Sequence, residues 1–179
     1  MTDRFRSDCP EDFLQLKQRA AQMPAAIALA SPERDALTYL ELERRLQAMR
    51  LEAAGAGLGP GEIAALVLPN GPDLITAFLA VAGIGAGAPL DPSSTEDEFR
   101  YYLNRLGARI VIVPDGVTSP AVAAGAGLRI PVLRIRSPGT FMSRLPDNVE
   151  TARSFRSTDA AILMFTSATT GAPKLVPHT

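Results

Sequence analysis

The chain is poor in the residues that most often carry redox, metal or base-stacking chemistry. Among 179 residues it has one cysteine, one histidine and no tryptophan, and aromatic side chains make up 6%. A single cysteine allows neither an intrachain disulfide nor a thiolate zinc cluster, and so few aromatic residues exclude a base-stacking platform. We therefore expect a reducing compartment and interpret Cys9, near the N-terminus, as incidental rather than nucleophilic.

Charge and hydropathy narrow the classes of partner. The chain has 18 Lys and Arg against 19 Asp and Glu, which leaves no basic surface for nucleic acid. Residues 3–12 are rich in charged side chains, so we expect no secretory signal there. The apolar stretch 74–90 is interrupted by glycines and a proline and is shorter than the roughly 20 residues of a spanning helix. We expect a cytoplasmic protein with no transmembrane segment and no nucleic-acid partner.

Four segments have the apolar spacing that predicts a helix. In the clearest one, apolar residues recur among charged ones and Gly55 and Gly57 follow as stop signals. Another begins at Thr95, which with Glu98 forms the pattern of a capping box. The predicted helices are 10–23, 42–53, 74–81 and 99–106.

Short apolar runs between these helices predict strands. Residues 63–68 are continuously apolar and end at a Pro-Asn-Gly-Pro turn, which is typical of a strand buried on both faces. The predicted strands are 25–30, 63–68, the end of the stretch 74–90, 109–113, 131–135 and 160–165. Strands that alternate with helices predict an α/β fold with a mostly parallel sheet and helices on both faces.

The segment after the last of these strands is the most informative part of the chain. Residues 166–174 contain four hydroxyl side chains, Gly171 and Lys174, a set that suits a polyanion because hydroxyl and loop N–H groups donate hydrogen bonds while the ammonium supplies charge. A Walker-type nucleotide-binding loop is disfavoured, because Ala172 and Pro173 separate the glycine from the lysine. An ordinary Ser/Thr/Gly turn with a solvated lysine is the remaining alternative.

The segment resembles the signature phosphate-binding motif of the adenylate-forming superfamily, which includes acyl-CoA synthetases and the adenylation domains of peptide synthetases. That motif reads Thr-Ser-Gly-Thr-Thr-Gly-x-Pro-Lys-Gly. The chain departs from it twice, because Ala168 and Leu175 stand where the family has glycine. It matches at Thr166, Ser167, Thr169, Thr170, Gly171, Pro173 and Lys174.

Other stretches are similar to the family in the expected order. Residues 37–42 are similar to its Leu-Thr-Tyr-x-Glu-Leu segment, residues 64–78 to its Leu-Pro-Asn-Gly-Pro-Asp-Leu stretch and residues 78–92 to its Pro-Leu-Asp/Asn-Pro segment. Asp91, in the last of these, is expected to form a turn. Residues 98–103 complete the set and resemble free-standing acyl-CoA ligases. The resemblance runs from about residue 37 to the last residue and is weak between 114 and 158.

This resemblance implies a two-step reaction and a set of ligands. A carboxylate substrate attacks the α-phosphate of ATP to give an acyl-adenylate, and a thiol of coenzyme A or of a carrier phosphopantetheine then displaces AMP. Mg²⁺ would neutralise charge on the leaving pyrophosphate. The residues expected to bind the β- and γ-phosphates are Thr166, Ser167, Ala168, Thr169, Thr170, Gly171 and Lys174.

The resemblance also predicts which parts of such an enzyme are missing. The family's adenine pocket, its hinge and its late catalytic lysine all follow the phosphate loop, so we expect residues 1–179 to be the N-terminal portion of the domain, without a catalytic residue or a metal ligand of its own. Such a fragment is expected to be inactive alone and to self-associate through exposed strand edges. Three functions stay open: an acyl-CoA synthetase, a peptide-synthetase adenylation domain, and a noncatalytic module that binds a nucleotide or a partner.

Overall fold

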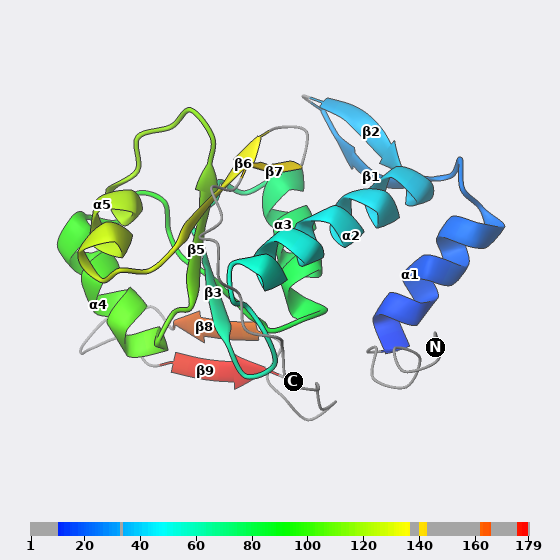
Figure 1. The fold of residues 1–179 in the computed structure, drawn as a ribbon. Coiled ribbons are helices and arrows are strands. Elements are labelled where there is room, and N and C mark those ends of the chain that lie inside the picture. The colour runs from blue at the N-terminus through cyan, green and yellow to red at the C-terminus, as the bar shows by residue number, and fades with distance from the viewer. Residues whose placement is uncertain (1–10, 33, 137–139, 143–161, 166–174, 179) are drawn as a thin grey trace.

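The computed structural model describes residues 11–32, 34–136, 140–142, 162–165 and 175–178, and these form an α/β fold (Figure 1). The main sheet has seven strands in the order β7-β6-β5-β3-β4-β8-β9, and a separate hairpin pairs β1 with β2. The strands are β1 Ile27–Ser31, β2 Arg34–Thr38, β3 Ile63–Leu66, β4 Ala86–Pro89, β5 Ile110–Pro114, β6 Val132–Arg136, β7 Thr140–Met142, β8 Ile162–Phe165 and β9 Leu175–His178. The helices are α1 Glu11–Gln22, α2 Tyr39–Gly55, α3 Pro72–Ala82, α4 Glu96–Leu106 and α5 Pro120–Gly127.

The centre of the main sheet is parallel, as the sequence predicts. Strands β3, β4, β5, β6 and β8 run in one direction, whereas β7 and β9 pair antiparallel at the two edges. The prediction of a mostly parallel sheet is therefore confirmed. In such a sheet the strands end along one common edge, which is where ligands of open α/β folds gather.

Helices cover both faces of the sheet, which confirms the predicted arrangement. In β3 and β5, alternate residues face opposite sides: Ala64 and Ile112 pack in one core layer with α2 and α3, and Ala65 and Val111 in the other with α4 and α5. Figure 1 shows α2 and α3 on one side of these strands and α4 and α5 on the other. Because both faces are buried, these strands read in sequence as continuous apolar runs.

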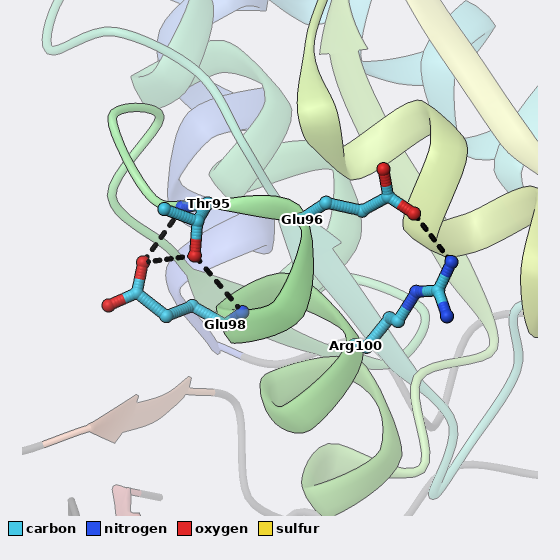
Figure 2. A network of polar contacts seen from close by, with 4 residues as sticks. All are labelled: Thr95, Glu96, Glu98 and Arg100. Carbon is cyan, nitrogen blue, oxygen red and sulfur yellow. Dashed lines mark hydrogen bonds and ion pairs between the residues drawn. The ribbon is translucent and has the colours of Figure 1, made fainter.

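Two helices begin at the capping boxes that their sequences indicate. The Oγ1 atoms of Thr38 and Thr95 accept hydrogen bonds from the backbone N–H groups of Glu41 and Glu98, both at 3.3 Å. The side chain of each glutamate accepts a bond from the threonine backbone in return, at 2.9 and 2.7 Å. Figure 2 shows the second box together with the ion pair of Glu96, which follows Thr95, and Arg100, one turn further along α4.

The predicted elements are present with small shifts at their ends, and four elements were not predicted. The strand expected at 63–68 ends at Leu66, and that at 160–165 begins at Ile162. Helix α5 was missed because its alternation of alanine and glycine has no apolar periodicity, although Ser119 and Pro120 are a typical N-cap and first residue. Strands β2, β7 and β9 also went unpredicted.

Candidate functional site at the carboxyl edge of the sheet

Strand β8 ends at the edge where the parallel strands end, immediately before the hydroxyl-rich segment. It runs parallel to β4, with Ile162 opposite Gly87, and ends at Phe165. The segment 166–174 therefore follows directly from the carboxyl edge. The expected phosphate ligands themselves lie outside the described residues, so their role stays a prediction. They are Thr166, Ser167, Ala168, Thr169, Thr170, Gly171 and Lys174.

The segment is bracketed by a pair of antiparallel strands. Strand β9 pairs with β8 so that Leu175 lies opposite Phe165 and His178 opposite Ile162. Adjacent strands lie about 4.8 Å apart, so the residues on either side of the hydroxyl-rich segment, Phe165 and Leu175, are neighbours. Phe165 and Leu175, the described residues on either side of the segment, therefore both lie at the carboxyl edge.

This pairing explains one departure from the family motif. Leu175 belongs to β9 and has extended backbone, which a leucine adopts as readily as other residues and which needs no glycine. At the other end of β9, His178 lies opposite the first residue of β8. Because a strand rises about 3.3 Å per residue, His178 sits roughly 10 Å from the level of Phe165, near the amino end of β8. Pro177 is compatible with β9 because β9 is an edge strand.

A rigid turn ends the neighbouring strand β4. The carboxylate of Asp91 accepts hydrogen bonds from the backbone N–H and the hydroxyl of Ser93, at 2.9 and 2.7 Å, which confirms the predicted turn. These bonds lower the pKa of Asp91 below its usual range. The pKa of Glu98 is likewise lowered, by its backbone and side-chain hydrogen bonds from Thr95. Both carboxylates therefore stay ionised at neutral pH.

A cleft of about 500 Å³ opens elsewhere along the same edge, between the ends of β3 and β5. Helices α3 and α5 leave these adjacent strands toward opposite faces, so the cleft is at a topological switch point of the sheet. Its described lining includes Asp73 and Asp115 but neither lysine nor arginine, a poor environment for a polyphosphate. This lining does not favour phosphate binding in the cleft, which sequence reasoning did not identify.

Among the residues that the structure describes, no helix has the length and apolar character needed to cross a membrane. In that same part, no three His, Cys, Asp or Glu side chains are grouped so that they hold a metal ion.

Comparison with known proteins identifies relatives along nearly the whole chain. The sulfoacetate–CoA ligase of Cupriavidus necator is 34% identical over 165 residues, which are 87% of this chain and 32% of the ligase. Malpibaldin synthetase of Mortierella alpina is 31% identical over 172 residues, which are 90% of this chain and 3% of the synthetase. This chain therefore spans a third or less of the length of these relatives.

Solved structures show the same fold. ATP-bound MatB from Rhodopseudomonas palustris superimposes with a TM-score of 0.74 at 21% identity, covering 92% of this chain and 34% of MatB. The model of the family described as AMP-binding enzyme matches residues 16–179, a range that includes both the described sheet and the hydroxyl-rich segment. The chain belongs to the AMP-binding, or adenylate-forming, enzyme family.

Proposed function

We propose that residues 1–179 are the N-terminal portion of an adenylate-forming acid–thiol ligase and that they bind the polyphosphate of ATP. The observation that carries the proposal is the placement of β8. This strand lies in the parallel sheet beside β4 and ends at the carboxyl edge directly before the segment with four hydroxyls and Lys174. A polyanion at that position meets hydroxyl and N–H donors together with one positive charge.

In this proposal the segment binds the β- and γ-phosphates while a carboxylate oxygen attacks the α-phosphate. The bond between the α-phosphorus and the bridging oxygen breaks, pyrophosphate leaves, and an acyl-adenylate remains. A thiol then attacks the acyl carbon and AMP leaves. Lys174 contributes by stabilising charge that accumulates on the pyrophosphate. Mg²⁺ commonly binds through substrate phosphates and one or two carboxylates, so here it would arrive with ATP.

The thiol is coenzyme A in our first candidate, an acyl-CoA synthetase. This candidate is supported by the residues 98–103, which resemble free-standing acyl-CoA ligases, and by the similarity to a named CoA ligase. A peptide-synthetase adenylation domain, which passes its product to a carrier phosphopantetheine, is the second candidate. The similarity to malpibaldin synthetase favours it. We place either enzyme in the cytoplasm, with a small-molecule carboxylate as substrate and self-association of the isolated chain through the edge strands β7 and β9.

The test measures polyphosphate binding by the 179-residue chain. Inorganic tripolyphosphate with Mg²⁺ is titrated calorimetrically into the wild type and into Lys174→Ala. A charge-assisted phosphate contact contributes roughly 1.5–3 kcal/mol, so we expect binding to weaken by about 10–100-fold. Lys17, the only other lysine in the chain, is exposed on α1, and Lys17→Ala is the matched control that should bind like the wild type. Equal affinity of the wild type and Lys174→Ala would refute the assigned role, and so would an absence of binding by the wild type.

A further inference from the structure

Strand β4, the parallel neighbour of β8, is built from very small residues. It reads Ala-Gly-Ala-Pro, whereas strands usually favour β-branched and aromatic side chains. Ala86 and Ala88 pack in the core layer that contains Phe99 of α4. A side chain at position 87 would point to the opposite face, where α3 lies. Packing on both faces, rather than strand propensity, accounts for this composition.

An aromatic ring from α3 lies close to the position that the Cβ of a side chain at Gly87 would take. A Cβ atom built on Gly87 lies 3.2 Å from Cδ2 and 3.4 Å from Cε2 of Phe78, and 3.4 Å from Cδ1 of Leu66. Gly87 is not among the glycines with positive φ, so its backbone conformation is open to any residue. The constraint at Gly87 is therefore steric, because an added Cβ would be in tight contact with the ring of Phe78.

The same glycine is the residue through which β8 joins the parallel sheet. Gly87 lies opposite Ile162 in the parallel pairing of β4 with β8. Three residues after Ile162, β8 ends at Phe165 and the hydroxyl-rich segment begins. Leu163 is buried on the α4 side, while Met164 is 50% exposed. A displacement of β4 at Gly87 is thus transmitted to β8 by backbone pairing.

We propose that Phe78 and Gly87 are positioning residues for the phosphate-binding segment, acting through β4 and β8. This inference rests on the proposed function of that segment. The close approach of the Phe78 ring to Gly87 sets the distance between β4 and α3. Because β4 pairs with β8, it also sets the position of β8, which leads into the hydroxyl-rich segment. Phosphate sites depend on such placement, because a misplacement of about 1 Å costs on the order of 100-fold in a positioned reaction.

The first measurement follows β8 itself and needs no ligand. In Gly87→Ala the added methyl group must move its neighbours by a few tenths of an ångström. With ¹³C-methyl methionine labelling, we expect the signal of Met164 on β8 to shift, while that of Met23, which is exposed just after α1, stays in place. Phe78→Leu combined with Gly87→Ala removes the clash and should return the Met164 signal toward its wild-type position. An unmoved Met164 signal in Gly87→Ala would overturn the proposal.

The second measurement follows binding of Mg²⁺-tripolyphosphate. We expect Gly87→Ala to weaken binding by about three- to tenfold, scaled from the cost of misplacement, and the double variant to recover most of that loss. Gly127→Ala is the control, because its nearest atom, in the guanidinium group of Arg100, is 3.8 Å from the new Cβ. If the wild type binds and Gly87→Ala binds equally well, the positioning role is wrong. If the wild type does not bind, the proposed function fails, whereas the Met164 signal still decides whether Phe78 and Gly87 position β8.

Discussion

Gly85, in the turn between α3 and β4, has no free space for a side chain. A Cβ atom built there lies 2.8 Å from the carbonyl oxygen of Glu62, 3.0 Å from that of Gly59 and 3.2 Å from Cδ1 of Leu58. The two oxygens belong to backbone that is itself hydrogen-bonded: Glu62 donates its N–H to Gly59, and Ala86 donates to Glu62, both at 2.9 Å. Unlike the end of a flexible side chain, this backbone moves only by breaking those bonds.

The expected loss of stability for Gly85→Ala combines two opposing terms. Overpacking of a well-filled site costs about 1–3 kcal/mol, and the reduced entropy of the unfolded chain returns about 0.4–1 kcal/mol. With the middle of each range, the net destabilisation is about 1.3 kcal/mol. For a domain of this size that corresponds to a fall in Tm of roughly 3–5 °C. The total free energy of unfolding of such a domain is only roughly 5–15 kcal/mol.

Urea titration followed by circular dichroism measures this loss. The midpoint should fall while the slope of the transition is unchanged, because the surface exposed on unfolding stays the same. Gly127→Ala, which meets only ordinary contact at 3.8 Å, should be as stable as the wild type or slightly more stable. Gly85→Ala with an unchanged midpoint would refute the steric reasoning, and with it our account of the close approach of β4 to the start of β3.

Two further predictions concern helix ends. Arg129, just after α5, has a φ of 57°, which is unfavourable for a residue with a Cβ. Arg129→Gly should therefore stabilise the chain by about 0.5–1 kcal/mol. A lower urea midpoint for this variant would contradict the prediction. The hydrogen bonds from Thr95 lower the pKa of Glu98 in the folded chain. The contribution of ionised Glu98 to stability is therefore present above the unfolded pKa of about 4.3. It is lost as the pH falls through the lowered pKa of the folded state. The Tm difference between the wild type and Glu98→Gln should therefore shrink between pH 7 and pH 3, and a constant difference would argue against an ionised Glu98 in the capping box.

Local chemistry made much of the fold predictable. Apolar periodicity and the capping box at Thr95 located α4, because both signals are contained within one helix. The continuous apolar runs of β3 and β5 likewise report burial on two faces. Strand β9 was missed because Leu175–His178 contains a proline, which counts against a central strand, and only its antiparallel pairing at the sheet edge makes it acceptable.

The candidate site was likewise predictable only in part. The residues 166–174 predict binding of a polyanion, because their hydroxyl groups and lysine can be identified from the sequence alone. The cleft between β3 and β5 was not visible, because its lining comes from stretches far apart in the chain, such as Leu68 and Ser119. Its position follows from the order of the strands and from the sides on which α3 and α5 leave the sheet, and neither is a property of a short stretch of sequence.

Three glycines between the end of α3 and the middle of β4 illustrate why a residue pattern needs a structure to be interpreted. Gly83, Gly85 and Gly87 appear in sequence as one glycine-rich stretch, yet each is adjacent to a different neighbour. A side chain at Gly83 would meet the guanidinium group of Arg50, one at Gly85 would meet backbone oxygens, and one at Gly87 would meet the ring of Phe78. The end of an arginine side chain gives way more readily than backbone does, and the ring of Phe78, at 3.2 Å, must move by a few tenths of an ångström. Alanine should therefore be tolerated least at position 85. The change at position 87 should act on β8 most directly, because Gly87 alone of the three is paired with it.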